Sequence, residues 1–206
     1  MKIENSSIEN KFKLAIEEQK KNNFNIAEKI YEEILEIEPN HLESICYLAT
    51  IFAQTKRTSL AKIFFLKAIE INPNNPRINN NLGNVYLQLG EIQNALRYYE
   101  KAIKSKPNYA DAHINLGIAF KSLKKNEQAL SCFEKAIKIQ PEYIRSYNIL
   151  GRTLKELGEY SKALNCFEEA IKINPENTML LYAILDLFTS IQFSILTEIM
   201  PEVLKN

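Results

Sequence analysis

The chain has 206 residues, of which 46% are hydrophobic and 25% are charged, and its net charge is +1. This composition is typical of a soluble globular protein, so it excludes disordered and collagen-like chains, and the balanced charge does not favour an electrostatic contact with nucleic acid. Five glycines are too few for a loop-rich β-protein or a glycine-rich nucleotide-binding fold.

The N-terminal segment and the cysteines indicate where the protein resides. The first ten residues are polar and include two glutamates, so we expect no secretory leader. Cys46, Cys132 and Cys166 are widely spaced and form no Cys-x-x-Cys pair, which favours neither a disulfide framework nor a zinc site. We therefore expect a cytoplasmic protein with free thiols.

The strongest pattern in the chain is a repeat of 34 residues. A proline recurs at this interval, at Pro39, Pro73, Pro107, Pro141 and Pro175. Upstream of each proline, an alanine precedes an aromatic residue by four positions, as in Ala95 and Tyr99. Further upstream, a leucine is followed by glycine or alanine, as in Leu82 and Gly83. A fixed period of this length is typical of stacked supersecondary units.

Each repeat is predicted to contain two amphipathic helices, because apolar residues recur at i, i+3, i+4 and i+7. The predicted first helices cover 8–21, 42–55, 76–89, 110–123 and 144–157. The predicted second helices cover 24–37, 58–71, 92–105, 126–139 and 160–173. A proline ends each second helix because it lacks an N–H donor and clashes with the preceding turn. The glycine after the leucine lets the two helices of one repeat approach closely.

This organisation resembles the tetratricopeptide repeat family. The array is most similar to that of O-GlcNAc transferase-like proteins, because Asn81 and Asn115 stand at equivalent positions of consecutive repeats. The resemblance implies an all-α, right-handed α-solenoid of about five helix-turn-helix repeats. The predicted organisation is a lead-in at 1–7, five repeats at 8–177 (8–41, 42–75, 76–109, 110–143 and 144–177), and an apolar capping helix or degenerate sixth repeat at 178–206.

The segment 178–200 departs from the repeat because it is almost entirely apolar. A membrane-spanning helix is disfavoured, since Asp186 near its middle would cost roughly 3 kcal/mol. We expect 178–190 to pack on the fifth repeat. An apolar stripe on the segment is then predicted to bind a second copy of the chain, or to be covered by 193–200 folding back as a short helix. The stripe comprises Leu180, Leu181, Leu187, Ile191 and Ile195.

No catalytic constellation is present in the sequence. It lacks a P-loop, a dinucleotide fingerprint, a nucleophile elbow and a zinc-protease motif. We interpret His41 and His113 as structural, and Cys132 and Cys166 as packing residues because they are equivalent positions of two repeats. The chain is therefore expected not to be an enzyme and to use neither a cofactor nor a metal.

The family resemblance implies a binding function instead. In such arrays the first helices line a concave groove that holds a peptide or a partner's helix. The predicted peptide-binding residues lie opposite the core stripe, at Arg77, Asn80, Asn81, Asn84, Asn115, Arg145, Asn148 and Arg152. Asparagine suits this role because its amide both donates to and accepts from a peptide backbone. The second repeat offers a more acidic and aromatic set, at Glu43, Cys46, Tyr47, Thr50 and Gln54.

Part of the carboxylate clamp of chaperone-binding cochaperones is also matched, at Asn84, Asn115 and Arg145. Asn80 stands where that clamp has lysine and Ile149 where it has arginine, and Arg152, one turn further along, is the candidate for the missing charge. We therefore expect a protein or peptide partner, including one with an acidic side chain or a C-terminal carboxylate, and no nucleic acid.

Two functions remain open from the sequence. One is a non-enzymatic scaffold that binds a peptide or partner segment in its groove. The other is the substrate-recruiting region of a glycosyltransferase, methyltransferase or sulfotransferase system whose catalytic domain is absent from this chain.

Overall fold

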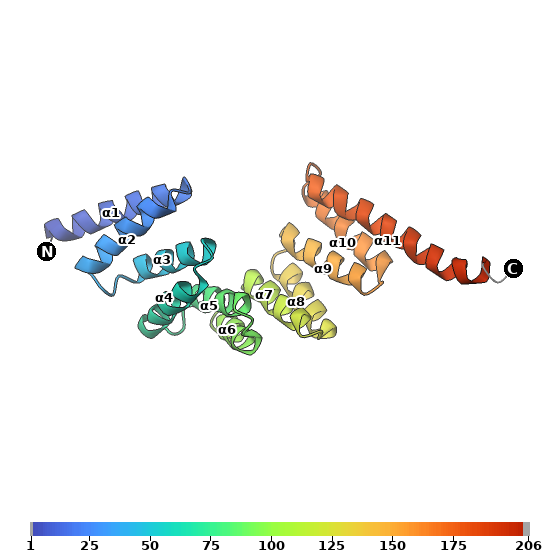
Figure 1. The fold of residues 1–206 in the computed structure, drawn as a ribbon, viewed down its shortest axis with the longest axis horizontal. Helices are drawn as coiled ribbons and strands as arrows, with labels where there is room; N and C mark the ends of the chain where they lie inside the picture. Colours follow the sequence, from blue (N-terminus) through green and yellow to red (C-terminus); the bar gives the residue numbers. More distant parts are fainter. Residues whose placement is uncertain (1, 204–206) are drawn as a thin grey trace. The chain divides into compact units, whose positions relative to one another are not determined.

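The computed structural model describes the backbone of residues 2–203 and the side chains of residues 8–193. This part of the chain contains eleven α-helices joined by short turns, and it contains no strand. Figure 1 shows the order of the helices. They are α1 (Lys2–Lys20), α2 (Phe24–Ile37), α3 (Leu42–Gln54), α4 (Thr58–Ile71), α5 (Pro76–Gln88), α6 (Ile92–Ser105), α7 (Ala110–Ser122), α8 (Asn126–Ile139), α9 (Ile144–Glu156), α10 (Tyr160–Ile173) and α11 (Thr178–Val203).

The all-α solenoid expected from the repeat is confirmed. Helices α2, α4, α6, α8 and α10 begin and end at the predicted residues, and the first helices end within one residue of the predicted position. Helix α1 differs because it begins at Lys2 instead of residue 8, so the predicted lead-in is largely helical. No glycine or proline precedes Lys20 to stop the helix from extending toward the N-terminus.

A left-handed residue follows the first helix of each of the five repeats. These residues are Asn22, Lys56, Gly90, Lys124 and Gly158, spaced one repeat apart, with φ between 57° and 78°. The amide that follows each of them reaches back five residues, as Glu91 N–H does to the Tyr86 carbonyl at 2.9 Å. This is the Schellman arrangement, which satisfies the free carbonyls at a helix end and turns the chain into the second helix.

The helices pack into two compact units, Met1–Pro107 and Asn108–Asn206. In the N-terminal unit, each of α1 to α5 packs on the helix that follows it, so the packing ends at α6. In the C-terminal unit, α7 to α11 pack in the same order, and α11 contacts α9 as well as α10.

Close contact between a glycine and an aromatic ring joins the two helices of a repeat. A Cβ placed on Gly151 of α9 would lie 2.8 Å from Cε1 of Phe167 on α10. A Cβ on Gly117 of α7 would lie closer still to the same atom of Phe133 on α8. Phe133 and Phe167 are fully buried. Only glycine therefore permits this helix spacing at positions 117 and 151.

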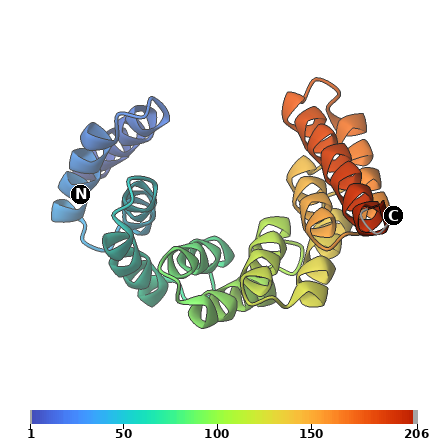
Figure 2. The ribbon, with the colours of Figure 1, turned by 45° about the vertical axis from the view of Figure 1, so that its right-hand side comes forward.

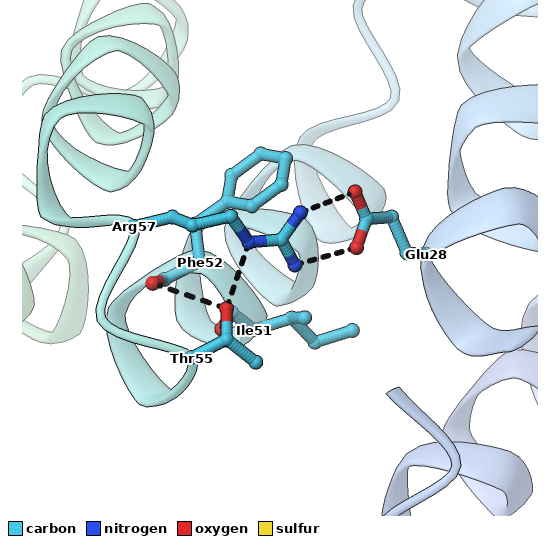
Figure 3. A network of polar contacts seen from close by, with 5 residues as sticks. All are labelled: Glu28, Ile51, Phe52, Thr55 and Arg57. Atoms are coloured by element: carbon cyan, nitrogen blue, oxygen red, sulfur yellow. Dashed lines mark hydrogen bonds and ion pairs between the residues drawn. The ribbon is translucent and has the colours of Figure 1, made fainter. Parts of the chain in front are cut away.

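A polar network ties the first repeat to the second within the N-terminal unit (Figure 3). The two terminal nitrogens of Arg57 donate to the two carboxylate oxygens of Glu28 on α2, at 2.7 and 2.6 Å. Arg57 Nε donates to Thr55 Oγ1 at 2.9 Å, and the guanidinium lies 4.6 Å from the centre of the Phe52 ring. The planar guanidinium thus binds the carboxylate and the ring together.

Replacing Arg57 by lysine is expected to lower the free energy of unfolding by about 1 kcal/mol. Lysine keeps the charge but loses the paired hydrogen bonds and the planar contact with Phe52, and partial solvent exposure limits the effect. Urea denaturation followed by circular dichroism measures it. Arg97→Lys, on an exposed position of α6, is the control and should leave stability unchanged. Equal effects of the two variants would contradict the role of the network.

Helix α11 runs without interruption from Thr178 to Val203 beside α10 (Figure 2). The prediction that 193–200 folds back as a separate helix is therefore wrong. Leu180 and Leu187 are buried against α9 and α10, so they do not belong to an exposed stripe, whereas Leu181 is exposed and Ile191 is half-buried. The Ile195 side chain lies outside the described residues. No helix in the described part of the chain has the length and apolarity needed to span a membrane.

Candidate functional site

In the N-terminal unit, α3 and α5 present two adjoining hollows. The first, hollow A, has a volume of about 150 Å³ and lies between Glu43 and Tyr47 of α3 and Arg77 of α5. The second, hollow B, has a volume of about 180 Å³ and continues toward the ends of the two helices. Thr50, Phe65 and Asn81 line both hollows.

Hollow A combines an apolar interior with charges of both signs. Tyr47 stacks on Tyr31 of α2, with ring centres 5.8 Å apart, and this stacking fixes one wall. The Glu43 carboxylate is exposed, lies 4.0 Å from His41, and carries negative charge at the edge of the hollow. Arg77 supplies a positive charge from α5.

The three predicted asparagines of α5 occupy different environments. Asn81 lies between the two hollows, is half-buried, and makes no side-chain hydrogen bond among the described residues. Asn84 lines hollow B and its Oδ1 accepts a hydrogen bond from the Tyr99 hydroxyl at 2.8 Å. Asn80 is only 4% exposed, so its side chain is buried in the core rather than presented to a ligand.

In the C-terminal unit, α9 and α11 carry a second pair of hollows. Hollow C, of about 260 Å³, lies among Lys121, Arg145 and Ile149. Hollow D, of about 240 Å³, lies between α9 and the residues Met179 and Tyr182 of α11. Both hollows share two lining residues, Asn148 and Arg152.

Ion pairs neutralise most of the basic side chains that line these two hollows. Arg145 donates to Asp111 at 2.9 Å, Lys121 pairs with Glu156 at 2.8 Å, and Lys155 pairs with Asp186. Arg152 has no such partner among the described residues and its side chain is exposed. One uncompensated positive charge therefore stands where hollows C and D meet.

Two predicted site residues of this unit are less accessible than expected. Asn115 is 6% exposed and its Oδ1 accepts a hydrogen bond from Arg145 at 3.1 Å, so it positions Arg145 rather than facing a ligand directly. Asn148 is half-buried, and its Oδ1 has no hydrogen-bond partner among the described residues.

Several lining residues were not predicted from the sequence. Phe65 and Phe167 reach the hollows from the second helices α4 and α10. Met179, Tyr182 and Asp186 come from α11. The signal for the α11 residues is the repeat itself, because they stand 34 positions after Arg145, Asn148 and Arg152.

The thiol that lines hollow A is not activated for nucleophilic chemistry. Burial raises the pKa of the Cys46 thiol in hollow A to about 11, so the thiol is protonated and weakly nucleophilic at neutral pH. Within the described residues, no group of three or more His, Cys, Asp or Glu side chains is arranged to hold a metal ion. What the hollows offer is apolar surface with amide and charged groups beside it, which suits binding.

Sequence comparisons find tetratricopeptide repeats in the chain. Two models described as Tetratricopeptide repeat match residues 74–142 and 144–177. A third, described as Anaphase-promoting complex, cyclosome, subunit 3, matches residues 20–102. No curated protein matches the chain.

Solved structures of repeat proteins share the fold. PilW, described as a widely conserved type IV pilus biogenesis factor, has 20% identity and a TM-score of 0.78 over 97% of this chain and 95% of its own. TTC0263, a thermophilic TPR protein of Thermus thermophilus, has 17% identity and a TM-score of 0.76 over 88% of this chain and 99% of its own. YrrB, described as a TPR protein with an unusual peptide-binding site, has 22% identity and a TM-score of 0.62 over 84% and 89%. At these identities the likeness establishes the fold, and the resemblance to O-GlcNAc transferase stays a prediction.

Proposed function

Since the chain is an α-solenoid that carries tetratricopeptide repeats, we propose that it is a non-enzymatic scaffold that binds a peptide or partner segment on its first helices. One observation carries the proposal. Asn81 in the N-terminal unit and Arg152 in the C-terminal unit each lie between two hollows and have no side-chain partner among the described residues. The peptide-binding site described for YrrB supports a binding role for this fold.

The N-terminal unit is proposed to hold an extended segment through its backbone. Hollows A and B are each large enough for one apolar side chain, and Asn81 lies between them. Alternate side chains of an extended peptide point to the same side, so two of them fit the two hollows. The amide of Asn81 then both donates to and accepts from the intervening peptide group.

The C-terminal unit is proposed to select an acidic residue next to an apolar one. Arg152 offers the uncompensated guanidinium, which pairs well with a carboxylate because two parallel hydrogen bonds form. Met179 and Tyr182 of α11 line the adjacent hollow D and are largely exposed. A side-chain carboxylate and a C-terminal carboxylate share this chemistry, and both kinds of ligand are included in the test.

Selection from a displayed library of random peptides tests the proposal. Two libraries are used, one with free C-termini and one with both ends fused, and the full chain serves as bait. We expect enriched peptides in which an acidic residue adjoins an apolar residue. Enrichment in the free C-terminus library alone would assign the carboxylate to the C-terminus. Failure of both libraries to enrich any peptide that binds the full chain would contradict the proposal.

Substitutions at the two unpartnered residues are expected to weaken binding of a selected peptide. Arg152→Ala removes a charge-assisted contact and should raise Kd roughly 10- to 100-fold, and the effect should shrink as salt rises. Asn81→Ala should raise Kd roughly fivefold through lost backbone hydrogen bonds. Fluorescence anisotropy with labelled peptide measures both changes.

Matched controls lie on exposed positions of the second helices. Arg97→Ala on α6 and Asn165→Ala on α10 remove the same side chains there and should leave Kd unchanged. If all four variants bound the peptide alike, the first helices would not form the site.

Recruitment of substrates for a separate glycosyltransferase, methyltransferase or sulfotransferase has less support. The resemblance behind that function depends on accessible asparagines at equivalent positions of consecutive repeats, Asn81 and Asn115. Asn115 is buried and its Oδ1 accepts a hydrogen bond from Arg145, so of these two residues Asn81 alone offers an accessible amide. The cytoplasmic location expected from the cysteines stays a prediction.

A further inference from the structure

Helix α11 has three distinct faces. Leu180 and Leu187 pack into the core of the C-terminal unit. Tyr182 lies on the second face, which lines hollow D. The third face, which we call the outer face, consists of Leu181, Leu185 and Phe188, whose side chains are 47%, 60% and 52% exposed. These three residues are spaced i, i+4 and i+7, so they form one continuous strip.

The outer face corresponds to the face that packs on a second helix in the other repeats. Leu185 stands one repeat after Gly151, whose position contacts Phe167 of the following helix. A leucine there cannot accept the close approach that glycine permits at positions 117 and 151. The outer face is therefore not shaped for the second helix of an ordinary repeat.

The turn that would start such a second helix is also missing. Gln192 stands one repeat after Gly158 and two after Lys124, both of which adopt positive φ. In α11 this position is helical, and the helix continues to Val203. With 26 residues, α11 is about 39 Å long, twice the length of α9.

The outer face has the spacing of a coiled-coil seam. The residues Leu181, Leu185, Phe188 and Gln192 are separated by four, three and four positions, and the sequence continues the alternation at Ile195 and Ile199, whose side chains lie outside the described residues. This average of 3.5 residues matches the seam along which two helices pair. A single polar residue within such a seam, here Gln192, fixes the register of pairing.

Electrostatic repulsion does not oppose contact between the outer faces of two copies of α11. No residue of the seam is charged, and Asp186, the acidic residue of α11 within the described side chains, pairs with Lys155 on α9. A second copy of α11 therefore meets no like charge along the strip. A twofold arrangement places identical residues opposite one another, as the commonest homodimers do.

We propose that the outer face of α11 binds the same face of a second copy of this chain, giving a twofold dimer. The seam of one helix pairs with the seam of the other, at the interaxial distance of about 8–10 Å that side chains such as leucine require. Hollow D stays open in this dimer because Met179 and Tyr182 lie on another face of α11. Two linked copies then present two sets of binding sites, which strengthens binding to a partner that carries repeated segments.

Sedimentation equilibrium of the full chain from about 1 to 100 µM tests the dimer. We expect a concentration-dependent shift from monomer to dimer that is insensitive to salt, since the seam is apolar. The double variant Leu181→Glu with Leu185→Glu should weaken association at least roughly 100-fold, because each change counts twice in a twofold interface. Both leucines are exposed, so the variant should keep the wild-type circular dichroism spectrum.

The control places the same changes at equally exposed isoleucines of the N-terminal unit. Ile26 and Ile63 are 51% and 59% exposed, and Ile26→Glu with Ile63→Glu should leave the dimer intact. A wild-type chain that stays monomeric at every concentration would overturn the proposal. Association that the control abolishes as fully as the α11 variant would overturn it too. Because no peptide is present, the outcome is independent of whether the groove binds a ligand.

Discussion

Replacing Phe133 by alanine is expected to lower the free energy of unfolding of the C-terminal unit by about 3–5 kcal/mol. The ring is fully buried between the two helices of its repeat and belongs to the continuous core of that unit. Removing it leaves a cavity that neighbouring helices cannot close, since each repeat is held by its neighbours alone. Urea denaturation followed by circular dichroism, at a concentration below that of dimer formation, measures the loss.

The partner of this ring supplies the control. Gly117→Ala puts a Cβ against the ring of Phe133, closer than van der Waals contact allows, and is expected to cost about 1–3 kcal/mol because the core has no room for it. In the Phe133→Ala background the same change should cost nothing or stabilise, since alanine favours a helix over glycine by up to about 1 kcal/mol. Strictly additive effects would show that the two positions do not touch.

The second large effect is expected at Leu187. Leu187→Glu should lower the free energy of unfolding by at least about 3 kcal/mol, because it removes a buried side chain and places an unpaired carboxylate in the core. Leu185→Glu, two residues earlier on the outer face, should change the stability of the monomer by less than about 0.5 kcal/mol. Denaturation of the two variants at low concentration compares them directly. Equal losses would mean that α11 is packed in a different orientation.

Most of the fold could be predicted because the repeat encodes it locally. A proline ends each second helix, and glycine at 83, 117 and 151 marks the close crossing with an aromatic residue. Lys56 and Lys124 also adopt positive φ, although neither is a residue type that favours it. The residue type of these two lysines does not indicate a turn. Their place between the two predicted helices of a repeat does.

The C-terminal segment was harder to predict because its composition hides its faces. The predicted stripe contains both Leu180 and Leu181, but adjacent residues of a helix point about 100° apart. The structure buries Leu180 and exposes Leu181. In a segment where nearly every residue is apolar, the sequence pattern does not distinguish the face that packs from the face that stays exposed. Comparison with equivalent positions of the earlier repeats does distinguish them.

The candidate site was predicted in part for a related reason. The sequence identifies the polar residues of the first helices, but it does not indicate how far each side chain is buried. Asn80 and Asn115 are buried, whereas Asn81 and Arg152 line hollows and remain unpartnered within the described residues. A polar side chain is not available to a ligand when it is already hydrogen-bonded to a neighbouring helix, as Asn115 is to Arg145. Such contacts join segments that are distant in the sequence, so spacing along the chain does not reveal them.

Locating a bound peptide on the chain tests most directly whether the first helices form the binding site. Amide hydrogen exchange of the full chain is measured with and without a saturating peptide selected from the libraries, at a concentration below dimer formation. We expect slower exchange in α3 and α5, in α9 and α11, or in both pairs, with no change in α4, α6 and α8. Protection confined to the second helices would contradict the assignment of binding to the first helices.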